Sequence, residues 1–182
     1  MNFIEKIIDK FLSWREGKID WQKVDDSFLI FSDLRHIKGW IKEKDTVIIA
    51  AHCHPVPGTE VYAMGFEKRI RKIVSVQSDG NTDIAICKLD KPFGDDIRIY
   101  KVADKVEKLQ KVITFHQDRS FSERRIKFLS DKQVRGSYFE RKIIAGDSGL
   151  PWLGWNGKKF VVVSHNHRGE YGIGPDYSKL LG

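Results

Sequence analysis

The sequence predicts an all-β protein whose antiparallel strands form a sandwich or barrel. Two observations carry this prediction. Short segments rich in Val, Ile and aromatic residues recur from residue 27 onward, and turn residues separate them, among them Pro57, Gly58, Asn156 and Gly157. Only residues 3–14 carry a helical pattern. Many short strands with frequent turns and almost no long helix are typical of this class.

The first element is a helix over residues 3–14, because apolar residues recur there with the spacing of one helix face. These positions are Phe3, Ile4, Ile7, Ile8, Phe11 and Leu12. We expect this face to dock on the body of the protein. The alternative is a helix that lies on a membrane surface.

The strands follow in order after Gly17. They are expected at residues 27–31, 39–41, 46–51, 60–64, 73–77, 83–89, 97–102, 111–116, 125–129 and 160–165. The tight Asn156-Gly157 turn predicts a hairpin that leads into the last of them. A boundary near residues 103–106 divides this β-rich region into halves of similar size.

The composition limits the possible binding partners and the cellular compartment of the protein. The 182 residues carry a net charge of +7, which is compatible with a nucleic-acid or acidic-membrane partner but is also common on solvated surfaces. Only Cys53 and Cys87 are present, which favours a reducing compartment over a disulfide scaffold. Charged residues interrupt the first 17 residues, so we expect no signal peptide and a cytoplasmic protein. No run of about 18 apolar residues predicts a membrane-spanning helix.

Three polar residues stand where strands begin or end. His52 follows two alanines at the end of "TVIIAAHCHP", and small residues let an imidazole approach the backbone closely. Asp83 opens the strand "DIAICKL", where an acid can accept a hydrogen bond from a histidine and fix its tautomer. Taken singly, the histidine reads as a polar strand end and the aspartate as a turn residue that caps backbone N–H groups.

The third is Ser148 in "AGDSGLP". A serine hydroxyl needs a neighbouring base to become a nucleophile, and it needs N–H donors aimed at the developing oxyanion. Gly146 and Gly149 allow the tight backbone that such donors require. A plain β-turn is the alternative, because Gly, Asp and Ser are all turn formers.

Together, the order His52, Asp83, Ser148 and the three motifs resemble the chymotrypsin-like serine proteases. "GWIKEKDTVIIAAHC", "TDIAICKLDKP", "AGDSGLP" and the closing "KFVVVSHNHRGEYGIGPDYSKL" all match the family pattern. The resemblance covers about residues 26–180 and is closest to compact bacterial or viral members that need no zymogen cleavage.

The resemblance implies two antiparallel β-barrels, over residues 26–105 and 106–182, after a helical extension at residues 1–25. It implies a serine endopeptidase that acts on polypeptides without a cofactor or metal. His52 would be the base, although His54 is an alternative, Asp83 would orient it, and Ser148 would attack the carbonyl. The N–H groups of Gly146 and Ser148 would form the oxyanion hole.

The chain departs from the family pattern at three positions. Cys53 matches a residue that is disulfide-bonded in many secreted members, and we expect a buried free thiol here. Asp147 needs an internal partner, because the new N-terminus that pairs with it in digestive members is not expected. Leu150 replaces a glycine, and we expect its side chain to pack into the second barrel.

Substrate preference is predicted from the family's pocket positions. Lys142 falls six residues before the serine, where a cation would repel basic side chains. Ser164, His165 and Asn166 fall in the segment that usually lines the substrate. These residues favour glutamate, glutamine or another non-basic residue before the scissile bond. Lys142 pointing to solvent is the alternative.

A function of another class also fits the composition. The basic, aromatic-interleaved stretch from Arg119 to Lys142 could bind nucleic acid or an acidic protein in a non-catalytic module. It comprises Arg124, Arg125, Lys127, Phe128, Lys132, Arg135, Tyr138 and Phe139. A solvated strand face is the simpler interpretation.

Overall fold

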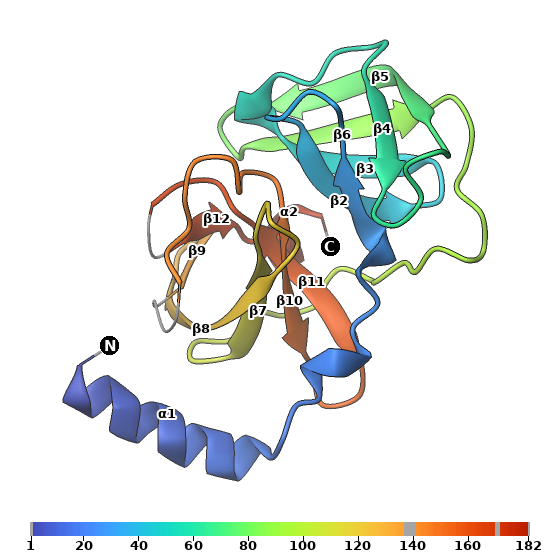
Figure 1. The fold of residues 1–182 in the computed structure, drawn as a ribbon. Helices are drawn as coiled ribbons and strands as arrows, with labels where there is room; N and C mark the ends of the chain where they lie inside the picture. Colours follow the sequence, from blue (N-terminus) through green and yellow to red (C-terminus); the bar gives the residue numbers. More distant parts are fainter. Residues whose placement is uncertain (1, 137–140, 170–171, 182) are drawn as a thin grey trace.

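The all-β prediction is confirmed by a computed structural model that describes residues 2–136, 141–169 and 172–181. Two antiparallel sheets of six strands each, packed against one another, make up the body, and one long helix lies outside them (Figure 1). The predicted boundary near residue 105 falls in the connection between the last strand of the first sheet and the first strand of the second.

The first sheet is a closed barrel with strand order β1-β2-β3-β6-β5-β4. Its strands are β1 (Leu29–Phe31), β2 (Lys38–Glu43), β3 (Thr46–Ala50), β4 (Glu60–Ala63), β5 (Arg71–Asp79) and β6 (Ile84–Leu89). Every residue of β3 is buried, which is why this strand reads as a continuous β-branched run rather than an alternation. Closure leaves the barrel without a free edge.

The second sheet has the order β11-β10-β7-β8-β9-β12. Its strands are β7 (Lys111–Phe115), β8 (Phe121–Leu129), β9 (Gln133–Gly136), β10 (Pro151–Trp155), β11 (Phe160–His165) and β12 (Ile173–Pro175), followed by the short helix α2 (Tyr177–Leu180). The expected Asn156-Gly157 hairpin joins β10 to β11, and Gly157 has a φ of +95° that suits glycine.

Some strand predictions were wrong. Residues 97–102 form no strand, since only Val102 makes an isolated bridge, to Val162 of β11. The buried side chains of Ile97 and Tyr100 gave this segment the apolar texture of a strand. The short strands β9 and β12 escaped prediction because glycine and proline interrupt their patterns.

A shared core joins the two sheets. It contains Trp40 and Ile48 from the first sheet and Ile113 and Leu153 from the second, all fully buried. Leu150 lies in the same cluster and is fully buried, so the leucine beside the serine packs into the contact between the sheets.

The N-terminal helix α1 (Phe3–Glu16) forms as predicted, but its orientation was predicted wrongly. None of its residues is buried, and all of its apolar side chains except the half-buried Leu12 are exposed, with Phe3 77% and Trp14 81% accessible. Its acidic side instead faces the second sheet, where Asp9 and Glu16 both bind the guanidinium of Arg125. Ion pairing to this buried arginine outweighs the apolar face in setting the orientation.

Candidate active site

His52 lies where β3 ends at the contact between the sheets. Directly after Ala50 the chain enters a 3₁₀ turn, Ala51–Cys53, and the Ala51 N–H donates to the carbonyl of Asp83 at 3.0 Å. The alanines let this turn pack against the start of β6. The His52 side chain is left 41% exposed and faces solvent on one side.

Asp83 is buried and receives the His52 ring. His52 Nδ1 lies 2.8 Å from Asp83 Oδ1, and the His52 backbone N–H donates to the same oxygen at 2.9 Å. His165 Nε2 lies 3.1 Å from the other oxygen, Oδ2. Burial raises the pKa of the Asp83 carboxyl, but the hydrogen bonds from His165 and His52 outweigh it, and the pKa falls well below its usual value. An ionised Asp83 only accepts hydrogen bonds, so Nδ1 of His52 carries the proton and Nε2 is left toward the cleft.

A second layer of buried polar groups supports Asp83. His165 is fully buried and also bonds through Nδ1 to the hydroxyl of Tyr177. That hydroxyl in turn accepts the indole N–H of Trp40 at 3.0 Å. These contacts form one chain, Trp40–Tyr177–His165–Asp83. It links the first sheet, β11 and the C-terminal helix α2 behind the Asp83 carboxylate.

We expect Tyr177→Phe to lower the free energy of unfolding by about 1–3 kcal/mol, because it leaves buried groups of Trp40 and His165 without a partner. Urea denaturation of the wild type and the variant measures this difference. Ser178→Ala, which alters a half-buried hydroxyl one residue further on, is the control. An unchanged denaturation midpoint in Tyr177→Phe would contradict the proposed network.

The loop before β10 presents Ser148. Gly149 has a φ of +86°, and a Cβ there would lie 2.2 Å from the carbonyl oxygen of Lys38, so this position requires glycine. Gly146 has a φ of +96°, and a Cβ there would clash with the side chain of Gln117. No described residue accepts a hydrogen bond from the backbone N–H of Gly146 or Ser148.

Asp147, between these two residues, is fully buried. Its Oδ2 lies 2.9 Å from Nδ1 of His116 and accepts the Ile144 N–H at 3.1 Å, while Oδ1 accepts the Gln117 N–H at 2.9 Å. Burial raises the pKa of this carboxyl, but these hydrogen bonds more than offset it and hold the pKa below its usual value. The internal partner that Asp147 was expected to need is present.

A cavity of about 290 Å³ separates His52 from the serine loop. Its lining residues are His36, His52, Cys53, His54, Gly146 and Ser148. The Ser148 hydroxyl makes no hydrogen bond to any described residue, and such contacts are often long before substrate binds. His54, the alternative base, has a left-handed backbone (φ 50°) and no bond to Asp83 among the described residues.

Cys53 is the other nucleophile that lines this cavity. It is free and buried, as predicted, and so is Cys87. Burial, with a smaller contribution from the Asp83 charge, raises the pKa of the Cys53 thiol to about 11. Because the thiolate is the reactive form, this burial disfavours Cys53 as a nucleophile at neutral pH.

The residues predicted to bind substrate do not gather at this cavity. Ser164, His165 and Asn166 are buried, and the Asn166 amide donates to the carbonyl of Asp147 at 3.0 Å. Their side chains are inside the protein and cannot contact a substrate in the cavity. Substrate binding by the backbone of these residues stays a prediction. Lys142 is exposed and is not among the lining residues, and its role also stays a prediction.

Two further histidines lie close to His52 and were not predicted from the sequence, namely His167 and His36. The His167 ring stacks on that of His52 with centroids 5.4 Å apart, and its Nδ1 lies 3.9 Å from Asp83 Oδ2. His167 lies two residues past the end of β11, where strand alternation no longer fixes the side a residue occupies, so no local signal marked it as facing His52.

His52, Asp83 and His167 also bring their ligand atoms within 4.8 Å of one another, a spacing that could hold a metal ion. An ion there would have to displace the 2.8 Å contact between His52 and Asp83. These three residues could therefore bind a metal ion only if His52 and Asp83 gave up their hydrogen bond to each other.

The basic stretch from Arg119 to Lys142 does not form one surface. Arg124 and Arg125 are buried, and Lys127 pairs with Glu5 of α1 at 2.9 Å. Tyr138 and Phe139 lie outside the described residues. Burial and pairing of these residues leave the predicted nucleic-acid interface without support. No helix in the described part of the chain is both long enough and apolar enough to cross a membrane.

Comparisons with known proteins agree with this architecture. The chain is similar in structure to kallikrein-related peptidase 10 in complex with Zn²⁺, with a TM-score of 0.72, 13% identity, and coverage of 86% of this chain and 92% of that one. A second structure of kallikrein-related peptidase 10 gives a TM-score of 0.70 at 14% identity with the same coverage. No protein-family model and no curated protein sequence matches the chain. The protein has the fold of the trypsin-like serine proteases.

Proposed function

We propose that the protein is a serine endopeptidase that uses His52, Asp83 and Ser148. One observation carries the proposal: His52 is held by a buried, ionised Asp83 on one side of the cavity that Ser148 lines on the other. Its free Nε2 is the base that a serine hydroxyl in this cavity needs. The fold similarity to serine peptidases supports the same assignment.

The reaction follows the chemistry of such a site. His52 Nε2 takes the Ser148 proton as Oγ attacks the peptide carbonyl, and the N–H groups of Gly146 and Ser148 stabilise the oxyanion. The imidazolium then gives its proton to the leaving amine, which leaves an acyl-enzyme ester on Ser148. Water, deprotonated by His52, hydrolyses the ester and restores the serine.

We propose further that the residue before the scissile bond is acidic or an uncharged amide. No carboxylate lies among the described residues that line the cavity, whereas His36, His52 and His54 do. A lysine or arginine side chain would therefore find no counter-charge there, and a glutamate or glutamine would find hydrogen-bond donors. A cleavage profile over a peptide library tests this preference, and preferred cleavage after Lys or Arg would contradict it.

The non-catalytic binding module is the weaker candidate, since the basic residues on which it rests are partly buried. A fluorophosphonate probe separates the two proposals. Labelling of the folded protein at Ser148 supports the peptidase, and its complete absence favours the binding module.

A further inference from the structure

We infer that His116 is a positioning residue that keeps the serine loop in its catalytic conformation. The inference rests on the proposed peptidase function. His116 follows β7 directly and is fully buried. Its contact with the serine loop is Asp147, the residue before Ser148, and Nδ1 of His116 lies 2.9 Å from the Asp147 carboxylate.

The hydrogen bonds around His116 determine its tautomer. Because the ionised Asp147 carboxylate only accepts, Nδ1 of His116 carries a proton. Nε2 lies 2.7 Å from the hydroxyl of Ser122, and that hydroxyl is also a neighbour of Thr114 Oγ1 at 3.2 Å and Arg124 Nη2 at 3.4 Å. Arg124 donates to Ser122, which leaves the serine proton for Nε2. The imidazole thus connects Asp147 to β8.

Three contacts from this one turn hold the loop. Besides His116, the Gln117 N–H donates to Asp147, and the Gln117 side chain donates to the carbonyl of Ala145 at 3.2 Å. These contacts bracket Gly146 and Asp147, and so they place the two N–H groups proposed for the oxyanion hole. If His116 were absent, a buried carboxylate would lose its side-chain donor and the loop would rearrange to solvate it.

Two substitutions of His116 test the contacts of its two ring nitrogens one at a time. The amide nitrogen of His116→Asn can take the place of Nδ1 and still donate to Asp147, but it loses Ser122. In His116→Gln the longer side chain reaches Ser122 and loses Asp147. We expect His116→Gln to label with a fluorophosphonate at least about 10²-fold more slowly, the scale of a lost oxyanion donor. His116→Asn should label within a few-fold of the wild type, and the defect should lie in the rate of inactivation rather than in probe binding.

Thr114→Val is the control for stability, because it removes a buried hydroxyl of the same network without touching Asp147. Rates are normalised to the folded fraction measured by circular dichroism. Equal labelling rates in His116→Gln and the wild type would overturn the inference, as would equal loss in the Asn and Gln variants. An unlabelled wild type would refute the peptidase proposal itself, so the two failures are distinguishable.

A second observation, independent of the active site, concerns α1. We infer that the exposed face of this helix docks on an anionic membrane surface. The face consists of Phe3, Ile4, Ile7, Ile8, Phe11 and Trp14, each at least 40% exposed. In Figure 1 the helix lies at the outside of the second sheet, with the N-terminus at its far end.

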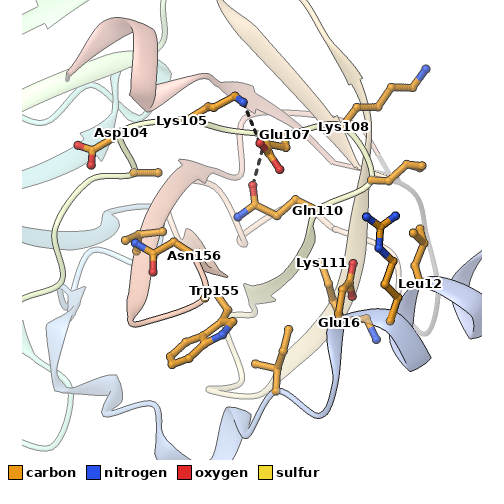
Figure 2. A pocket seen from close by; sticks show the side chains of 16 residues that line it. Leu12, Glu16, Asp104, Lys105, Glu107, Lys108, Gln110, Lys111, Trp155 and Asn156 are labelled. Atoms are coloured by element: carbon orange, nitrogen blue, oxygen red, sulfur yellow. Dashed lines mark hydrogen bonds and ion pairs between the residues drawn. The ribbon is translucent and has the colours of Figure 1, made fainter.

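The charges of α1 are sorted between its two sides. Its acids face inward: Asp9 and Glu16 bind Arg125 at 2.6 and 2.8 Å, and Glu5 binds Lys127 at 2.9 Å. Arg125 is only 3% exposed, so this anchor is a buried one. Packing between helix and sheet is otherwise loose, with a hollow of about 780 Å³ between them that Leu12, Glu16 and Lys111 help to line (Figure 2).

The basic residues of the helix are not paired as its acids are. Lys6, Lys10 and Arg15 are exposed, and none of them pairs with an acid in the described part of the chain. Lys6 and Lys10 lie away from the hollow, whereas Arg15 at the end of the helix also lines it. The outward side of α1 is therefore apolar with only positive charge around it. This combination complements an anionic lipid surface, where the apolar side chains enter the acyl boundary and the lysines meet the headgroups.

Co-sedimentation tests this with vesicles of phosphatidylcholine and phosphatidylserine, against vesicles of phosphatidylcholine alone. We expect binding to the mixed vesicles, weakened by salt and lost in Ile7→Ser/Phe11→Ser. Lys6→Gln/Lys10→Gln should bind roughly 30-fold more weakly, from about 1 kcal/mol for each charge. Val74→Ser, at an exposed apolar position on β5 of the other sheet, should bind like the wild type.

Failure of the wild type to sediment with the mixed vesicles would overturn the inference, and so would equal binding of the Ile7→Ser/Phe11→Ser variant. Light scattering after size-exclusion chromatography tests the alternative, in which the exposed face of α1 binds a second copy of the chain. A dimer that this variant returns to monomer, without vesicle binding by the wild type, would assign the face to a second copy.

Discussion

Replacing Ser148 with alanine is expected to lower peptide hydrolysis by about 10⁶-fold, the loss seen when a serine nucleophile is removed from such a site. The reason is that Cys53, the other nucleophile of the cavity, has a pKa raised to about 11 and cannot substitute for the serine. Cleavage of a peptide library, followed by mass spectrometry, measures the loss.

Ser78→Ala is the matched control, because Ser78 is an exposed serine on β5 of the first sheet. It should retain full activity. If Ser148→Ala still cleaved peptides at the wild-type rate, the nucleophile would be another residue.

The second large effect is expected for Asp83→Asn, with a loss of about 10⁴-fold in turnover. An asparagine keeps the shape of the side chain but not its charge, and its amide can present a donor where His52 Nδ1 needs an acceptor. The ring would then hold the wrong tautomer, with the proton on Nε2 facing the serine. Hydrolysis by the folded variant, relative to the wild type, gives the size of the loss.

Asp79→Asn provides the comparison. Asp79 is exposed at the same turn and accepts the Asn81 N–H, so it matches Asp83 in local backbone role without touching a histidine. Equal activity of Asp83→Asn and Asp79→Asn would show that the carboxylate does not orient the base.

The sequence predicted local features well, because they depend on neighbouring residues. The apolar run of β3 with two small residues before His52, the turn before Asp83, and the glycines around Ser148 are each encoded within about ten positions. In the structure His52 and Ser148 line one cavity and Asp83 contacts His52 from behind, while their role as a triad stays a prediction.

What escaped prediction depends on register between distant segments. His165 is the buried last residue of β11, whereas His167 lies beyond the end of the strand and stacks on His52. A register shift between Trp152 and Leu153 of β10 lies beside them, and neither the shift nor the end of the strand is visible in the local sequence. The contact of His116 with Asp147 likewise spans 31 positions and is invisible in either local segment.

The orientation of α1 is a third case of this kind. A helical period identifies an apolar face and an acidic face, but it does not say which of them meets the protein. That choice depends on Arg125, a buried cation more than a hundred residues away along the chain.

Covalent labelling with a fluorophosphonate, followed by peptide mapping, tests whether Ser148 is the nucleophile. We expect one adduct, on Ser148, which disappears in Ser148→Ala, forms slowly in Asp83→Asn and forms at the normal rate in Ser78→Ala. If the folded wild-type protein takes up no label, or takes it up on a residue other than Ser148, Ser148 is not the nucleophile of a serine peptidase.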